Sequence, residues 1–383
     1  MKIALDVSCL IQQPLTGVGY YTLNQVQALI RDARDVEIQA FASSAQGPPQ
    51  CLAALAQGCA GSKIVGWPTR LKTLLWTRFE WPPIEWFTGP VDIAHGAFHL
   101  LPPSRGAKRM VTVFDLSAVR HPEMHSGSSV TTHRALLRHA VSRADALVAI
   151  SESCKTDLIE CLGARPERVH VAYGGVSLEE FDGAGAQESP AEIARRHGIE
   201  GPYLIHLGTL EPRKNLPRLI EAYARLKAKH PECPKLVLAG HAGWMFEPVF
   251  ETIQRLRLSE AVVHTGYLTR AEAVGLLRGA YACVYPSLYE GFGVPVLEAM
   301  AARVPVLTSN VSSLPEVIGD TGILVDPGSV DAIEAGLVDL LVRRDEALAR
   351  TGPAYERAAQ FTWSKSARAL AGVYRMLMEE GES

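Results

Sequence analysis

Apolar residues follow two patterns that alternate along the chain. Short continuous runs predict buried parallel strands, and they occur at residues 3–7, 111–113, 146–150, 203–207 and 235–239. Apolar residues at helical spacing follow several of these runs, most clearly in residues 20–30 and 216–226. This alternation in both halves predicts an α/β protein with two doubly wound parallel sheets, each of which binds ligands at the carboxyl ends of its strands.

Composition predicts where the two halves meet. A chain of 383 residues is long enough for two hydrophobic cores. Residues 182–190 contain Gly, Ala, Gln, Ser and Pro and are the best candidate for a linker. We therefore predict an N-terminal domain at residues 1–183 and a C-terminal domain at 192–363. A last helix at 364–383 has an apolar face that suits packing on either domain.

Charge and cysteine usage narrow the class of protein. The net charge is −3, so the overall balance gives no indication of a nucleic-acid partner. The seven cysteines are scattered and lack Cys-x-x-Cys spacing, which predicts reduced thiols and neither a disulfide framework nor a zinc site. We find no N-terminal signal pattern and no apolar run of membrane-spanning length. These features predict a cytoplasmic protein that is soluble or peripheral on a membrane.

The stretch from Glu290 to Glu298, which reads Glu-Gly-Phe-Gly-Val-Pro-Val-Leu-Glu, is the most informative part of the chain. It follows an apolar run, and Pro295 predicts that a helix begins there. Gly291 and Gly293 allow backbone amides to approach a ligand, and a helix N-terminus favours phosphate. Carboxylates beside a diphosphate are repelled unless they bind neutral hydroxyls. The pattern therefore fits a nucleotide sugar, whose phosphates lie between two polyols.

Arg213 and Lys214 place two cations after the predicted strand at 203–207 and before Asn215, a predicted N-cap. Cations at that position suit a diphosphate, and they would stabilise the charge that develops on it during glycosyl transfer. A metal ion would then be unnecessary. An isolated Arg-Lys pair is more often a solvated surface feature, just as an isolated glutamate is more often structural. The surrounding residues favour function in both cases.

Four motifs resemble those of retaining glycosyltransferases of the GT-B fold, in particular family 4. In chain order they are Thr16-Gly17-Val18-Gly19-Tyr20, Gly208-Thr209-Leu210-Glu211-Pro212-Arg213-Lys214-Asn215, Glu290-x7-Glu298 and Phe361-Thr362-Trp363. The resemblance covers almost the whole chain and is more specific in the C-terminal half. It implies two Rossmann-like domains that face a cleft, with an acceptor-side N-terminal domain and a C-terminal domain that binds the nucleotide sugar. It also implies that the helix at 364–383 crosses back to the N-terminal domain.

The resemblance assigns roles to the charged residues of the donor site. Glu290 would contact hydroxyls of the donor sugar, and Glu298 would contact the ribose. Arg213 and Lys214 would hold the diphosphate. Tyr267 and Leu268 follow a predicted strand that ends at Thr265 and are the two candidates for contacting the base. The other candidates for donor binding lie in loops, and they are Gly17, Gly208, Gly291, Phe292 and Gly293.

The acceptor side has fewer candidates. Asp115 follows the strand at 111–113, so it would either orient the acceptor and accept its proton or cap the next turn. Relatives commonly carry His-Asp at this position, whereas this chain has Phe114 before the aspartate. A histidine that acts as general base at this position is therefore in doubt. His95 ends another predicted strand and is the second candidate. An isolated histidine near a core strand is more often structural.

Residues 61–90 suggest contact with a membrane. This stretch concentrates aromatic and basic residues, namely Lys63, Trp67, Arg70, Lys72, Trp76, Arg78, Trp81 and Trp86. Indole rings favour bilayer interfaces, and basic side chains attract anionic lipids. Glu80 and Glu85 count against this interpretation, and the tryptophans could instead pack under a loop. The expected location is the cytoplasm, and peripheral attachment to the inner face of the cytoplasmic membrane is a further expectation.

These observations predict a retaining, metal-independent hexosyltransferase. It would move a hexose from a GDP- or UDP-linked donor to a lipid-linked oligosaccharide or polysaccharide precursor. The first and second motifs resemble those of bacterial mannosyl- and rhamnosyltransferases of surface polysaccharide assembly most, so GDP-mannose is the first donor to test. The alternatives are a nucleotide-sugar epimerase or hydrolase of the same fold and a non-catalytic module that binds nucleotide sugars.

Overall fold

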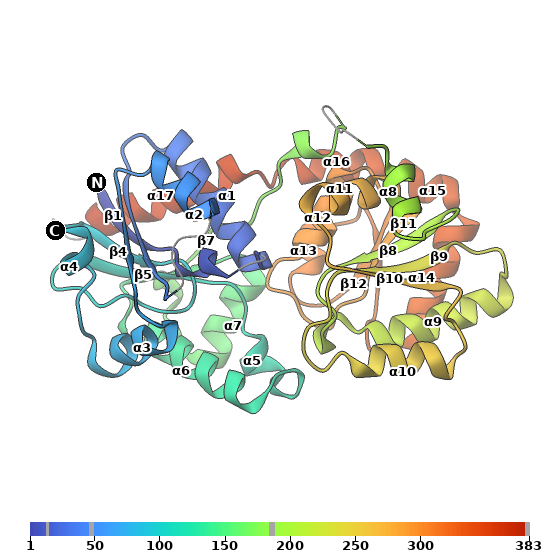
Figure 1. Cartoon of the computed structure of the whole chain (residues 1–383), viewed down its shortest axis with the longest axis horizontal. Coiled ribbons are helices and arrows are strands. Elements are labelled where there is room, and N and C mark those ends of the chain that lie inside the picture. The colour runs from blue at the N-terminus through green and yellow to red at the C-terminus, as the bar shows by residue number, and fades with distance from the viewer. Residues whose placement is uncertain (13–14, 46–49, 184–187, 380–383) are drawn as a thin grey trace. The chain divides into compact units, whose positions relative to one another are not determined.

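The computed structural model describes the chain except for residues 13–14, 46–49, 184–187 and 380–383 (Figure 1). Contacts divide it into two units, Met1–Gly175 with Phe361–Ser383 and Val176–Gln360. Both boundaries differ slightly from the predicted ranges. Glu180 binds Arg270, which attaches its segment to the second unit, and the indole of Trp363 packs on the first. Part of the predicted linker lies outside the described residues.

The first unit contains a sheet of parallel strands in the order β3-β2-β1-β4-β5-β6-β7. Its strands are β1 (Lys2–Asp6), β2 (Glu37–Ser43), β3 (Gly61–Val65), β4 (Ile93–Gly96), β5 (Lys108–Val113), β6 (Ala146–Ala149) and β7 (Val169–Val171). Its helices are α1 (Gly17–Asp32), α2 (Gln50–Gly58), α3 (Thr69–Leu74), α4 (Glu85–Thr88), α5 (Ser117–Arg120), α6 (Gly127–Arg143), α7 (Glu152–Leu162) and α17 (Trp363–Glu379). The strand order reverses between β1 and β4, which is the place where such sheets bind ligands.

The second unit contains a parallel sheet in the order β10-β9-β8-β11-β12-β13. Its strands are β8 (Tyr203–Leu207), β9 (Lys235–Ala239), β10 (Val262–Gly266), β11 (Ala282–Tyr285), β12 (Val306–Ser309) and β13 (Ile323–Val325). Its helices are α8 (Pro190–Arg196), α9 (Leu216–Lys229), α10 (Glu247–Arg255), α11 (Arg270–Arg278), α12 (Val294–Ala301), α13 (Leu314–Ile318), α14 (Val330–Val342), α15 (Arg344–Ala349) and α16 (Thr351–Ala358). The predicted fold class, α/β with two doubly wound parallel sheets, is confirmed.

Local sequence explains where several of these helices begin. Ser151 accepts a hydrogen bond from Cys154 N–H at the start of α7, and Thr269 with Glu272 forms a capping box at the start of α11. Asn215 occupies the N-cap position of α9, as predicted, but its side chain makes no capping hydrogen bond. Its backbone is left-handed, and its side-chain amide instead donates to the carbonyls of Pro286 and Pro327. Asn215 therefore ties three loops together at the ends of their strands.

The last helix returns to the first unit, as the resemblance implied. Figure 1 shows α17, at the red end of the chain, beside the blue α1. Gln25 donates to the Ser366 hydroxyl at 2.9 Å, and the rings of Tyr21 and Trp363 meet edge to face at 5.4 Å. Within the described residues, no helix has both the length and the apolar character that a membrane span needs.

Candidate functional site

Two loops at the switch point of the second sheet carry a cluster of charged residues. Strands β8 and β11 are parallel neighbours, so the loops that follow them leave the sheet side by side. The backbone N–H of Leu288 donates to the Arg213 carbonyl at 2.8 Å and joins the two loops. In doubly wound sheets this crevice is the usual ligand site.

Glu290 is the centre of this cluster. Its Oε2 accepts a hydrogen bond from Arg213 Nη1 at 2.5 Å, and its Oε1 accepts one from Lys214 Nζ at 2.6 Å. Glu211 lies 2.5 Å from the Nε atom of the same arginine. Burial alone would raise the pKa of Glu290, but the two cations outweigh it and lower the pKa to about 2. Two carboxylates and two cations therefore balance in a largely buried site.

The ammonium group of Lys214 also donates to the Tyr285 hydroxyl. Burial and Arg213 lower the pKa of Lys214, and Glu290 acts in the opposite direction. Gly208 lies beside this lysine with a φ of +149°, and a Cβ atom there would lie 3.7 Å from Lys214 Cε and 3.9 Å from Tyr285 Oη. A side chain at Gly208 would therefore cover Lys214, whereas glycine leaves space against it.

The turn from Glu290 into α12 presents backbone groups. Glu290 N–H donates to Ser312 Oγ at 3.0 Å, and its carbonyl accepts from Ser313 Oγ at 2.9 Å, so the glutamate is fixed at both ends. Gly293 has a φ of +102°, and a Cβ atom there would lie 2.7 Å from Leu314 Cδ2. Both its conformation and the space around it require glycine. In the first turn of α12 the Val296 and Leu297 amides donate to the Gly293 carbonyl, which leaves the Val294 N–H at the helix start to face an anionic oxygen.

Glu298 lies on α12 and is held by a residue that sequence reasoning missed. Its Oε1 lies 2.5 Å from Nη1 of Arg270, which also contacts Glu180 at 2.5 Å. Burial raises the pKa of Glu298, and Arg270 opposes this only in part. Arg270 opens α11 directly after the capping residue Thr269, at the carboxyl end of β10. This position at the end of a strand was the signal from which sequence reasoning could have identified Arg270 as a site residue.

The two candidates for contacting the base differ in exposure. The side chain of Leu268 is buried, as is that of Phe292, so both can offer only backbone to a ligand without rearrangement. Tyr267 is 56 % exposed and presents its ring to solvent. Of these residues, Tyr267 is the one with a surface on which a base could stack.

Gly17 and Asp115 lie in the first unit. Gly17 begins α1, where a Cβ atom would meet nothing within 4 Å, so space alone does not require glycine. Asp115 follows β5 and is half-buried, and its Oδ1 accepts from Ser117 N–H at 2.9 Å and from Ser117 Oγ at 2.6 Å. These bonds form the predicted turn cap and at the same time fix the direction of the carboxylate.

His95 sits in the interior of the first unit. Its Nδ1 lies 2.7 Å from the Tyr374 hydroxyl, and its Nε2 lies 2.9 Å from Thr112 Oγ1. Burial lowers the pKa of His95 to about 3, so the ring is neutral. Both nitrogens are occupied by the packing of α17 and β5, and this geometry favours a structural role over the predicted acceptor-side role.

The aromatic and basic segment at 61–90 divides into a buried part and an exposed part. Trp76 is fully buried, and Lys72 is also buried, where its Nζ lies 2.6 Å from Asp6 Oδ2 and above the Trp76 ring. The expectation that Lys72 attracts lipid is therefore wrong, because its ammonium group is buried and forms an ion pair with Asp6 inside the first unit. Trp81 and Trp86 remain about half exposed.

Possible metal ligands and a pocket beside the charged cluster are the remaining features of the described residues. Within them, no group of three or more His, Cys, Asp or Glu side chains could hold a metal ion. A pocket of about 440 Å³ borders the charged cluster, and it is lined by Glu211, Pro212, Asn215, Pro217, Arg218, Glu221, Met245, Pro248, Val249 and Leu288. It extends the ligand-accessible space beside Glu211.

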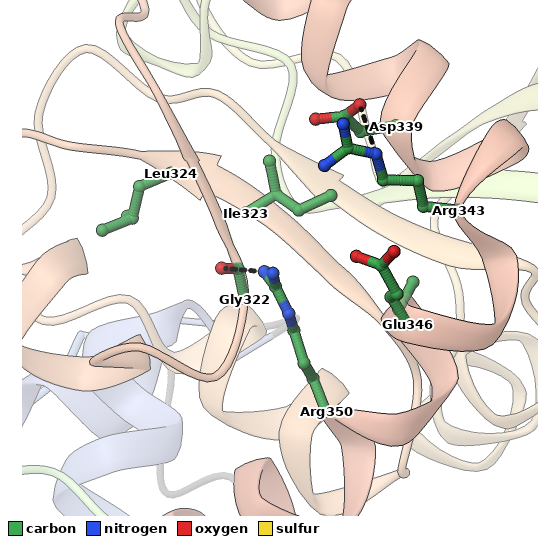
Figure 2. Close-up of a pocket in the computed structure, with 8 residues that line it drawn as sticks. Gly322, Ile323, Leu324, Asp339, Arg343, Glu346 and Arg350 are labelled. Carbon is green, nitrogen blue, oxygen red and sulfur yellow. Dashed lines mark hydrogen bonds and ion pairs between the residues drawn. The ribbon is translucent and has the colours of Figure 1, made fainter.

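A smaller pocket of about 180 Å³ lies at the edge strand β13, away from every predicted site residue (Figure 2). Its lining includes charges that already have partners. Arg343 lies 3.8 Å from Asp339, and Arg350 donates to the carbonyl of Gly322 at 3.1 Å. We assign no role in the chemistry to this pocket.

Comparisons with known proteins agree with this geometry. The family described as Glycosyltransferase Family 4 matches residues 15–180, and the family described as Glycosyl transferases group 1 matches residues 191–356. O-antigen chain mannosyltransferase B of Escherichia coli is 29% identical over 375 residues, which cover 96% of this chain and 98% of that protein. The serotype-specific mannosyltransferase WbdA of Escherichia coli is 34% identical over 252 residues, or 63% of this chain and 30% of WbdA.

Among solved structures, a sucrose-phosphate synthase from Thermosynechococcus elongatus superposes with a TM-score of 0.76. The match covers 99% of this chain and 100% of that one, at 19% identity. At this identity the likeness shows the fold alone.

Proposed function

The chain belongs to the family 4 glycosyltransferases and has the GT-B fold, and from this premise we propose that it transfers a hexose from a nucleotide sugar with retention of configuration. The observation that carries the proposal is the buried contact of Glu290 with Arg213 and Lys214 at the switch point of the second sheet. Two cations with a carboxylate between them match a diphosphate next to a sugar hydroxyl. Similarity to an O-antigen mannosyltransferase along almost its whole length supports mannose as the sugar and polysaccharide assembly as the process.

The proposed reaction needs no protein nucleophile. The bond between sugar C1 and the diphosphate oxygen breaks, and the acceptor oxygen bonds to C1 on the same face. The acceptor proton passes to the departing diphosphate oxygen. Arg213 and Lys214 stabilise the charge that develops on the diphosphate, and Glu290 orients the sugar through its hydroxyls. Glu298 would bind the ribose.

Thermal shift across a panel of nucleotide sugars, followed by product analysis, tests this function. A donor at 100 times its dissociation constant stabilises the protein by about 2.7 kcal/mol. We expect GDP-mannose to give the largest shift and transfer to require an acceptor. Conversion of the donor without acceptor would favour the epimerase or hydrolase alternative. Binding without turnover under any condition would favour the non-catalytic module.

Transfer should continue in the presence of EDTA. Arg213 and Lys214 supply the positive charge that a divalent ion would otherwise provide at the diphosphate. The measurement is the initial rate with and without chelator on protein dialysed free of metal. Loss of activity that Mg²⁺ or Mn²⁺ restores would contradict the metal-independent mechanism.

We also propose that the exposed part of residues 61–90 contacts an anionic membrane at the cytoplasmic side. Large apolar side chains gather there on the surface, namely Leu71, Leu74, Phe79, Trp81 and Trp86. Arg70 and Arg78 are exposed among them, and Arg105 lies over the Trp86 ring at 5.4 Å. Aromatic rings with adjacent cations suit a lipid interface.

The two glutamates of this segment differ in how far their charge is compensated. Glu80 lies 3.2 Å from Arg143 and 3.7 Å from Arg109, so its negative charge is compensated within the first unit. Glu85 accepts hydrogen bonds from Ser104 Oγ and from the Arg105 backbone, which are neutral donors, and it keeps its charge. One of the two glutamates therefore counts against contact with an anionic membrane.

Binding to vesicles containing phosphatidylglycerol should exceed binding to phosphatidylcholine vesicles and should fall as salt increases. Replacing Arg70 and Arg78 by Gln should weaken it by about 2 kcal/mol, at roughly 1 kcal/mol for each arginine. Trp81→Ala with Trp86→Ala should weaken binding to both kinds of vesicle. Trp244→Ala, which removes an exposed tryptophan of the second unit, serves as the matched control. Equal binding of the wild-type protein to phosphatidylglycerol and phosphatidylcholine vesicles at low salt would contradict the proposal.

A further inference from the structure

A group of histidine and aromatic side chains surrounds Asp115 at the carboxyl ends of β4 and β5. We call Phe98, His99, Asp115 and His133 the histidine cluster. Phe98 stacks on His99 with ring centroids 4.2 Å apart, and His133 of α6 meets both rings edge to face at about 6 Å. Asp115 and His133 interact electrostatically with His99, which places both groups close to its ring. No role assigned so far uses these histidines.

A hydrogen bond joins His99 to the residue before Asp115. This residue, Phe114, is buried in contact with Tyr21 and Phe98. The backbone N–H of Phe114 donates to His99 Nε2 at 3.0 Å. An imidazole from the loop after β4 therefore lies directly beside Asp115, although the sequence places no histidine before the aspartate.

The state of the His99 ring follows from its contacts. Burial lowers the pKa of His99 to about 4, with Asp115 opposing the change, so the ring is neutral at physiological pH. Because Nε2 accepts the Phe114 N–H, the proton sits on Nδ1. Within the described part of the chain, this buried Nδ1 has no hydrogen-bond partner. A buried donor without a partner is uncommon, and a ligand oxygen at this position would complete its hydrogen bonding.

The backbone of His99 adds a second, independent observation. Its φ is +34°, in a region that residues other than glycine rarely adopt. Such strain persists where the surroundings hold it and is concentrated at functional sites. The rings of Phe98 and His133, which are half-buried side chains, pack against the His99 ring.

We propose that the histidine cluster binds the hydroxyl-bearing sugar ring of the acceptor. His99 donates its Nδ1–H to the reacting hydroxyl oxygen, Asp115 accepts a hydrogen bond from the acceptor sugar, and Phe98 and His133 pack against the ring. Ser117 fixes Asp115, and His125 Nε2 in turn lies 3.0 Å from Ser117 Oγ. The neutral imidazole of His99 and the carboxylate of Asp115 suit a neutral glycan better than a phosphate. The inference rests on the proposed glycosyl transfer and specifies its acceptor side.

Substitutions at the cluster should separate acceptor binding from donor binding. With GDP-mannose and a synthetic mannose-terminated oligosaccharide as probes, Asp115→Asn and His133→Ala should each raise the acceptor KM about tenfold or more. Donor affinity, measured by calorimetry, should stay at the wild-type value. The matched control is His139→Ala, also on α6, whose ring pairs with Glu80 at 3.3 Å. It should change neither constant.

His99 calls for a substitution that keeps its structural bond. In His99→Gln the amide oxygen can still accept the Phe114 N–H, whereas the donor at the Nδ1 position is lost. We expect an unchanged melting temperature and an acceptor KM that is about tenfold higher. His99→Asn should keep a donor near Nδ1 and lose the bond to Phe114, so its melting temperature should fall.

The outcomes distinguish this proposal from the proposed function. Wild-type transfer together with unaltered acceptor kinetics in Asp115→Asn, His133→Ala and His99→Gln would overturn the acceptor site alone. Failure of the wild-type protein to bind or transfer from any nucleotide sugar would overturn the function itself, and the acceptor site with it. Parallel loss of donor affinity and acceptor use would also count against the cluster, because a site for the acceptor alone leaves donor binding intact.

Discussion

Lys214→Met should lower turnover by about 10²- to 10³-fold and weaken binding of the nucleoside diphosphate, because it removes a cation aimed at the developing charge. It should also destabilise the second unit by about 3 kcal/mol. The four charges around Glu290 balance in the wild type, and without Lys214 two buried carboxylates share Arg213 alone. The measurements are single-turnover rates, calorimetry with GDP and thermal melting.

A double substitution separates the loss of stability from the loss of chemistry. Lys214→Met with Glu290→Gln leaves Arg213 opposite Glu211, so the charges balance again and much of the melting temperature should return. Activity should not return, because both the cation at the diphosphate and the carboxylate that orients the sugar are missing. Lys72→Met is the matched control, since it breaks another buried lysine pair, with Asp6 in the first unit. It should lower stability while calorimetry still gives wild-type affinity for GDP. Recovery of turnover in the double variant would show that the lysine acts only on stability.

The sequence was sufficient to predict both sheets, because strands buried on both faces leave continuous apolar runs and their helices leave a clear periodicity. The same patterns placed Arg213 and Glu290 at the ends of β8 and β11, which are neighbours in the doubly wound sheet. The association of these residues could therefore be anticipated. The ion pair between their side chains could not be predicted, because side-chain distances and burial do not follow from the spacing of residues in the sequence.

Polar residues whose contacts the sequence did not reveal share one property. Lys72, His95 and Asn215 are polar residues whose partners lie far away in sequence, at Asp6, Tyr374 and Pro327. A local pattern treats such residues as surface charges, active-site groups or helix caps. Arg270 was missed for the corresponding reason, since its ion-pair partner Glu298 lies on another helix, α12.

Glu290→Gln and Glu298→Gln should affect different parts of the donor. Glu290→Gln should reduce transfer by about 10²-fold, since the amide cannot accept hydroxyl hydrogen bonds with the strength of a carboxylate. Its affinity for free GDP should stay the same or increase, because Arg213 and Lys214 lose a competing anion. Glu298→Gln should weaken GDP binding about tenfold through the ribose, as expected for one charged hydrogen bond. Calorimetry with GDP and steady-state kinetics with GDP-mannose measure the two effects.

The fold should survive both substitutions for reasons that the structure supplies. In Glu298→Gln, Arg270 keeps Glu180 as its partner, so no buried cation is left alone. In Glu290→Gln, Arg213 keeps Glu211, and the ammonium of Lys214 keeps the Tyr285 hydroxyl. Glu334→Gln is the matched control, because Glu334 is a buried glutamate of α14 that pairs with Lys229 at 2.6 Å. It should alter neither GDP affinity nor transfer. An equal loss of GDP affinity in both site variants would contradict the division of roles, because a glutamate that contacts only the sugar has no ligand atom to bind when GDP is offered alone.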